Sequence, residues 1–238
     1  MQSSLALIDR EAGSEPRLDR SRRAAPQVVD YLREKIIGLE FSPGTVLSRS
    51  EIAARFGLSQ TPVRDALMRL AEEGLVEIYP QHKTVVSRID LASARQAHFL
   101  RRSIEIEVAR TLAERRNAGF IRELRMTIAR QRSLLETADY AEFANADQDF
   151  HRQMFNAAGV PDLWDLVRRQ SGHIDRLRRL HLPTPGKGAD IVREHGRLVD
   201  ALARSDPALA EQRIREHMSG TMSRIEAIRS SHPDYVDA

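Results

Sequence analysis

From Leu91 almost to the end of the chain, apolar residues recur three and four positions apart. This spacing places them on one face of a helix, so the sequence predicts a series of amphipathic helices separated by short polar turns. Successive helices joined by short turns pack against one another as an antiparallel bundle. The expected helices cover residues 91–116, 118–136, 140–157, 161–181, 188–204 and 207–230.

Residues 25–88 carry a different pattern. Three short amphipathic stretches are followed by LVEIYPQHKTVVSRI, whose β-branched residues predict two strands around a tip at residues 80–83. Helix, short helix, tight turn, helix and β-hairpin is the order of a winged helix-turn-helix. The sequence therefore predicts a mainly α protein, with an N-terminal winged helix-turn-helix (25–88) followed by an all-α antiparallel helical bundle (91–231). Residues 1–24 are polar and are expected to form a flexible tail.

Composition excludes several classes of protein. The chain has no cysteine, which rules out disulfides and thiolate metal sites. No apolar run is long enough to span a membrane, and the N-terminus lacks the apolar core of a signal peptide, so we expect a soluble cytoplasmic protein. The net charge is only +3, and residues 25–88 carry eight basic and eight acidic side chains. Binding to DNA would therefore require charges sorted onto one face of that domain.

The start of the third expected helix, in LSQTPVRDALMRLAEEG, carries polar residues suited to DNA. The major groove is about 12 Å wide and admits one helix, whose N-terminal turn reaches the base edges. Glutamine pairs with adenine and arginine with guanine, although a base contact and a phosphate contact are equally open for Arg64. The candidate DNA contacts at this turn, before the second helix and at the wing are Arg49, Ser50, Ser59, Gln60, Thr61, Arg64, His82 and Lys83.

The segment FSPGTVLSRSEIAARFGLSQTPVRDALMRLAEEGLVEI resembles the winged-helix domain of GntR-family transcription regulators. The resemblance implies a double-stranded DNA operator as partner. The chain departs from the family pattern at two positions. Many members have arginine before the T-P pair, where this chain has Gln60, and glycine at the wing tip, where Lys83 is expected to stand.

Three histidines and one aspartate lie on the apolar faces of three expected helices. Burying polar groups is costly unless they are paired. A hydrogen bond would satisfy one carboxylate–imidazole pair, but a single shared partner accounts for all four residues together. Three imidazoles and a carboxylate suit a divalent metal, of which zinc is favoured and nickel and manganese are alternatives. The candidate ligands are Asp147, His151, His195 and His217.

Arg101 lies on the apolar face of the helix expected over 91–116, an unusual place for arginine. One interpretation is that it pairs with Glu105, one turn further along. The other is that its planar guanidinium binds the carboxylate of a ligand.

This half of the chain resembles the FCD effector domain of the FadR-type branch of the GntR family. The matching segments are LRRSIEIEVARTLA, DQDFHRQMFNAAG and EHGRLVDALARSDPALAEQRIREHM. Many members hold a divalent metal through an Asp-x-x-x-His pair and two later histidines, which here are Asp147, His151, His195 and His217. The family binds small organic acids beside that metal, often with an arginine from the first helix of the domain, and Arg101 fits that role.

Together these features predict a metabolite-responsive, DNA-binding transcription regulator that is not an enzyme. A homodimer is expected because two winged helices match a palindromic operator when they are related by a two-fold axis. In this family, the common mode of regulation is repression that the bound acid relieves. Two alternatives remain: a metal-dependent enzyme acting on a small organic acid, and a regulator whose metal is purely structural.

Overall fold

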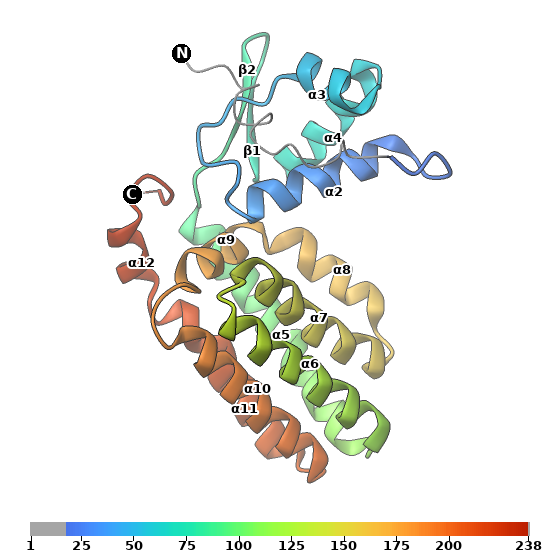
Figure 1. Ribbon diagram of the computed structural model, residues 1–238, viewed down its shortest axis with the longest axis vertical. Helices are drawn as coiled ribbons and strands as arrows, with labels where there is room; N and C mark the ends of the chain where they lie inside the picture. Colours follow the sequence, from blue (N-terminus) through green and yellow to red (C-terminus); the bar gives the residue numbers. More distant parts are fainter. Residues whose placement is uncertain (1–17, 238) are drawn as a thin grey trace. The chain divides into compact units, whose positions relative to one another are not determined.

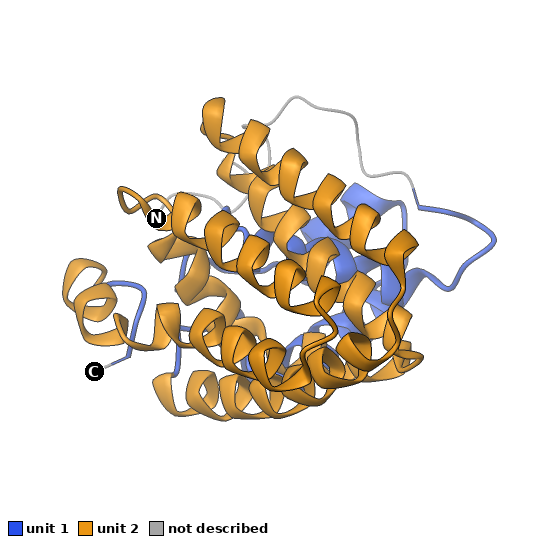
Figure 2. Cartoon of the chain, turned by 90° about the horizontal axis from the view of Figure 1, so that it is seen from below, with its two compact units in different colours: residues 1–90, 233–238 blue, residues 91–232 orange. Residues whose placement is uncertain are grey.

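The computed structural model describes residues 18–237, so most of the expected N-terminal tail (1–24) lies outside the described residues (Figure 1). The chain divides into two compact units, one of residues 1–90 with 233–238 and one of residues 91–232 (Figure 2). No helix in the described part combines the length and the apolar content that crossing a membrane requires.

The first unit is a winged helix-turn-helix, as predicted. Its helices are α2 (Ala24–Ile37), α3 (Arg49–Phe56) and α4 (Gln60–Glu72), and its wing is an antiparallel hairpin of β1 (Val76–Tyr79) and β2 (Lys83–Val86). The apolar faces of α2 and α4 pack together around Leu32, Leu67 and Leu70, none of which is more than 1% exposed. Ser48 caps α3 by accepting a hydrogen bond from the backbone N–H of Glu51.

The wing tip differs from the expectation. Lys83 begins strand β2 and pairs with Tyr79, so the turn consists of residues 80–82 only. The residue in the left-handed backbone region is Gln81, with φ 58°. The conformation that favours glycine is therefore needed at position 81, two residues before the place where the sequence suggested it.

The second unit is an all-α bundle with eight helices where six were expected. They are α5 (Leu91–Glu114), α6 (Ala118–Glu136), α7 (Tyr140–Ala158), α8 (Pro161–Gln170), α9 (Gly172–His181), α10 (Lys187–Ala203), α11 (Pro207–Met222) and α12 (Ile225–Ser231).

Two expected helices are each broken in two, and serine hydroxyls account for both breaks. The buried hydroxyl of Ser171 donates to the carboxylate of Asp175, and Gly172 follows it, a pair typical of sharp helix kinks. Near the end of α11, the hydroxyls of Ser219 and Ser223 donate to the carbonyls of residues 216 and 220. Such bonds compete with the helical pattern of the backbone.

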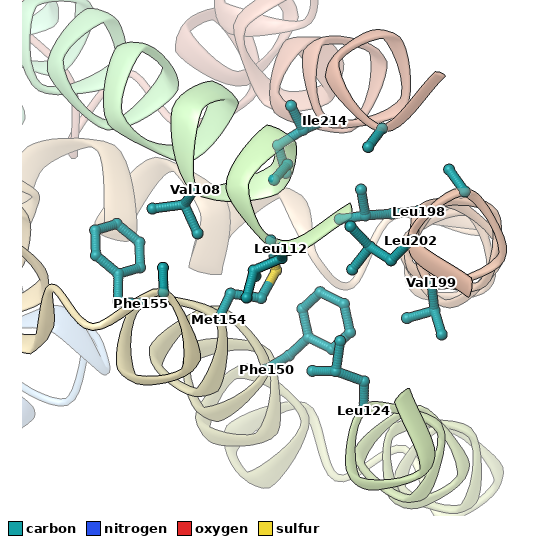
Figure 3. Packing of buried hydrophobic residues seen from close by; sticks show 14 of the residues in the cluster. Val108, Leu112, Leu124, Phe150, Met154, Phe155, Leu198, Val199, Leu202 and Ile214 are labelled. Carbon is teal, nitrogen blue, oxygen red and sulfur yellow. The ribbon is translucent and has the colours of Figure 1, made fainter. Parts of the chain in front are cut away.

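The core of the second unit fills the space between α5, α6, α7, α10 and α11 (Figure 3). Phe150 and Met154 of α7 lie at its centre, with Leu112, Leu124 and Leu198 from three other helices around them. Each is at most 6% exposed. This packing fixes the rotation of α7, and therefore the direction in which its polar residues point.

The C-terminal strap, which we define as residues 233–237, belongs to the first unit although the helix before it belongs to the second. Ile89 donates its backbone N–H to Tyr235 over 2.8 Å and accepts one from Asp237 over 3.0 Å. Ile89 and Val236 are 0% and 2% exposed. The Arg88 guanidinium also donates to the Val236 carbonyl over 2.7 Å.

Deleting residues 233–238 is expected to destabilise the end of the first unit by about 1–3 kcal/mol. The deletion uncovers the buried side chain of Ile89 and removes two backbone hydrogen bonds, and the ordering of fewer residues offsets part of that loss. The measurement is hydrogen exchange at the Ile89 amide, which should become faster. Asp237→Asn removes only the exposed ion pair with Arg88 and should change little. Unchanged exchange at Ile89 in the deletion would contradict the prediction.

Candidate DNA surface and candidate metal centre

The eight candidate DNA contacts are all exposed. Six of them line one hollow of about 620 Å³ between α3, the start of α4 and the wing: Arg49, Ser50, Gln60, Arg64, His82 and Lys83. Ser59 and Thr61 stand at the start of α4 beside that lining. The structure therefore gathers residues that are 34 positions apart in the sequence, from Arg49 to Lys83, onto one face of the first unit.

Packing of α4 sets which residues face outward. Val63, Leu67 and Leu70 are buried, which leaves Gln60 and Arg64 on the exposed side. No side chain caps the N-terminus of α4, so its first backbone N–H groups are open to a phosphate. Arg64 has only an exposed contact of 3.6 Å with Asp65, which is too weak to withhold it from DNA.

In the second unit the four candidate ligands meet at one point. Asp147 and His151 come from α7, His195 from α10 and His217 from α11. Nε2 of His217 lies 3.3 Å from Nε2 of both other histidines, and Nε2 of His195 lies 3.5 Å from Oδ1 of Asp147. One donor atom from each of the four residues lies within 4.8 Å of all the others.

Each histidine ring is held from its other side by a polar side chain. Nδ1 of His151 lies 2.7 Å from Oε2 of Glu105 on α5. Nδ1 of His195 lies 2.9 Å from Oε1 of Gln131 on α6. Nδ1 of His217 lies 3.1 Å from Oε2 of Glu194 on α10.

The contacts with Gln131 and Glu194 place a proton on Nδ1 of His195 and His217, because the facing oxygen accepts it. On these two rings the Nε2 lone pair then points into the cluster. The contact of His151 with Glu105 is close but lacks hydrogen-bond geometry. The ring of Phe150 stacks on His195 with 4.0 Å between centroids and fixes the plane of that imidazole.

Burial disfavours the protonated form of two of the three histidines, His195 and His217. It lowers the pKa of His195 well below its usual range, and the neighbouring His217 and His151 lower it further. Burial also lowers the pKa of His217, with His151 as the next cause. Neutral imidazoles are the form that ligates a metal. Burial raises the pKa of Asp147, whose Oδ1 is buried without a hydrogen-bond partner.

The residues present fit a divalent cation. Three Nε2 atoms and a carboxylate oxygen that has no hydrogen-bond partner in the described chain lie within 4.8 Å of one another, a crowding of lone pairs that is costly to bury unless a positive ion satisfies it. The outer contacts from Glu105, Gln131 and Glu194 are those that orient metal-binding imidazoles.

Of the two alternatives for Arg101, the structure shows the pair with Glu105, and it leaves part of the guanidinium available for a ligand. Its Nε donates to Oε1 of Glu105 in a fully buried pair, as the first interpretation requires. Its two terminal nitrogens form no hydrogen bond within the described chain. Burial disfavours the charged guanidinium, but Glu105, Asp175 and Asp147 outweigh it and raise the pKa of Arg101. A permanently charged group with two free donors therefore lies within electrostatic range of Asp147.

The comparisons with known proteins cover both units. Residues 24–86 match the family model of the bacterial regulatory proteins of the gntR family, and residues 96–220 match the FCD domain. An HTH-type transcriptional regulator in an unstable DNA locus of Streptomyces ambofaciens is 36% identical over 85% of each chain. The chain belongs to the gntR family of bacterial regulatory proteins.

Further relatives agree with this assignment. The HTH-type transcriptional repressor RspR of Escherichia coli is 28% identical over 93% of this chain and 97% of its own. Among solved structures, E. coli McbR/YncC shares the fold with a TM-score of 0.74 at 18% identity, covering 89% of this chain and 99% of that one. This gntR-family chain is a DNA-binding transcription regulator with an FCD domain.

Sequence reasoning missed all three outer contacts of this FCD domain, because Glu105 was considered only as a partner for Arg101. Gln131 follows the buried stripe of Phe120, Leu124 and Ile128 on α6 and is 0% exposed, so helical spacing carried a signal for it. Glu194 precedes His195 and lies on no apolar stripe, so only the folded chain brings it to His217.

Gln131→Ala is expected to weaken metal binding about 10–100-fold, because His195 loses the acceptor that orients its ring. Competition with a chromophoric chelator measures this affinity. Gln153→Ala serves as the matched control, since Gln153 bonds Thr127 rather than a member of the cluster. Equal affinity of the two variants would show that Gln131 does not orient the ligand.

Proposed function

We propose that this regulator senses a small carboxylic acid at a divalent metal held by Asp147, His151, His195 and His217, and that the acid changes its affinity for an operator. The observation that carries the proposal is the arrangement around the four residues. Three imidazoles bring their Nε2 atoms to one point, and the Nδ1 of each ring lies beside a carboxylate or amide oxygen. A metal bound there would act as a Lewis acid toward a carboxylate oxygen.

Zinc is the ion that this ligand set favours, with nickel and manganese as alternatives, because imidazole nitrogen suits borderline metals. Four protein ligands leave room in a larger coordination sphere for the acid or for water.

Arg101 supports the choice of a carboxylate as ligand. Its free terminal nitrogens form a fork that matches a carboxylate, while Glu105 holds the rest of the side chain in place. The same Glu105 carboxylate group faces His151, so one buried side chain positions both the metal ligand and the arginine.

For the DNA-reading unit we propose contacts through Arg49, Ser50, Ser59, Gln60, Thr61, Arg64, His82 and Lys83. A homodimer on a palindromic operator follows from the geometry of paired winged helices. Repression is the expected sign, in keeping with the names of two relatives, RspR and a probable D-xylose utilization operon transcriptional repressor of Paenarthrobacter nicotinovorans. The acid can shift operator affinity only by the difference in its affinity for the two states.

The test is thermal unfolding of the metal-loaded and metal-stripped protein with a panel of small carboxylic acids. One acid should raise the melting temperature of the loaded protein only. At a hundred times its Kd, the acid should add about 2.7 kcal/mol to the free energy of unfolding. Arg101→Met should abolish that response while metal still binds. Stabilisation by metal with no response to any acid would make the metal structural, and consumption of the acid would indicate an enzyme.

A further inference from the structure

A second cavity, of about 500 Å³, lies in the FCD unit between the end of α9, the start of α10, the end of α11 and α12. Its size is that of a pocket for a small molecule. Asp147, His151, His195 and His217 do not line it. It touches the proposed metal centre only through Glu194, which lines the cavity and also contacts His217.

Of the charged side chains that line the cavity, the acidic ones have a hydrogen-bond or ion-pair partner and the basic ones do not within residues 18–237. Asp190 is paired with Arg193 over 2.6 Å, and Glu194 faces His217 over 3.1 Å. The side chains of Lys187 and Arg224 also line the cavity, and neither makes a hydrogen bond or ion pair with the described part of the chain. The charge of Lys187 acts on the Glu194 carboxylate, but neither basic side chain is held by a hydrogen bond or ion pair in the described chain, so both remain available to a ligand.

Lys187 reaches across the cavity from α10 to α11. A Cβ atom placed on Gly220 would lie 2.6 Å from its Nζ, so the ammonium sits over a helix surface that is bare because residue 220 is glycine. Lys187 also begins α10, whose N-terminus no side chain caps. Unpaired backbone N–H groups and the positive end of the helix dipole add to the attraction for an anion there.

A buried imidazole completes the wall. His181 is only 8% exposed, lines the cavity, and has no hydrogen-bond partner for its Nδ1. Burial lowers the pKa of His181, and the charges of Lys187 and Arg224, which line the same cavity, lower it further. A neutral imidazole whose ring nitrogen has no partner can form a hydrogen bond with a ligand.

We infer that this cavity is a second binding site, which takes a small anionic metabolite with a phosphate or carboxylate group held by Lys187, Arg224 and His181. The site is separate from the proposed metal centre, because none of the three side chains belongs to that cluster. It therefore gives this regulator two chemical inputs.

The test is NMR of the full-length, metal-stripped protein titrated with inorganic phosphate and, separately, with succinate. At least one anion should cause saturable shifts in the backbone amides of residues 184–190 and 220–224. The anion that binds more tightly decides between the phosphate and carboxylate classes. The same shifts should persist in Arg101→Met, so that this site and the proposed acid sensor can fail independently.

The double variant Lys187→Met with Arg224→Met should weaken the binding at least tenfold. Arg197→Met is the matched control, because Arg197 is an exposed arginine of α10 that does not line the cavity. An unchanged spectrum outside the cavity would show that the double variant folds. Undiminished binding by the double variant, or shifts confined to other parts of the protein, would overturn the inference, as would the absence of saturable shifts with both anions.

Discussion

Replacing His195 by alanine is expected to lower metal affinity by more than the roughly 10–100-fold that loss of an outer contact causes, because a ligand itself is removed. His195 stands at the centre of the cluster, with its Nε2 close to both His217 and Asp147. The stability that metal adds should disappear as well, about 2.7 kcal/mol when the metal is at a hundred times its Kd. Metal content after dialysis and the melting temperature with and without zinc measure the two effects.

His98→Ala is the matched control for this experiment. His98 is a histidine of the same unit, half-buried on α5, and its Nδ1 has no hydrogen-bond partner to lose. It should keep the metal content of the unchanged protein. If His195→Ala also kept its metal, the four residues would be a hydrogen-bonded core cluster, and the acid-sensing proposal would lose its basis.

Arg64→Ala is expected to weaken operator binding by about 1–3 kcal/mol per half-site, or roughly 10–100-fold, if Arg64 reaches a base. Its guanidinium lies on the hollow between α3, α4 and the wing, with no strong protein partner. In the proposed dimer the loss counts at both half-sites. Fluorescence anisotropy with a labelled operator measures the affinity, and repeating it at several salt concentrations separates the two roles that the sequence left open.

If Arg64 contacts a phosphate, its loss should weaken binding to all sequences alike and reduce the slope of log binding constant against log salt concentration by about one. If Arg64 contacts a base, its loss should relax specificity at one position of the operator. Arg69→Ala is the control, since Arg69 is an exposed arginine of the same helix that does not line the hollow. Equal losses in the two variants would mean that α4 does not lie in the groove as proposed.

The sequence predicted the overall fold more completely than it predicted the local breaks and turns. The spacing of apolar residues was enough to predict the helices of the winged helix-turn-helix and of the bundle, because it shows directly which helix faces are buried. It could not locate the breaks at Ser171 and Ser223, where hydroxyl groups compete for hydrogen bonds inside an otherwise continuous pattern. Nor could it show that Gln81, rather than Lys83, takes the strained position of the wing.

The residues of the candidate site were also only partly predictable from the sequence. Four polar residues on apolar faces were visible in the sequence because a buried charge breaks the pattern. The outer contact from Glu194 was invisible, since it depends on the packing of α10 against α11. Arg101 shows a further limit, because spacing could not reveal that one guanidinium can satisfy Glu105 through Nε and still keep two nitrogens free.

The return of the C-terminal strap to Ile89 means that the polypeptide passes between the two units twice. A cut between Asp90 and Leu91 would therefore leave the winged-helix unit joined to the helical unit through the backbone hydrogen bonds between Ile89 and the strap. The second passage runs from the end of α12 to Ile89, three residues after the end of β2. The helical unit is therefore connected to the first unit at both of its ends, at Leu91 and at His232.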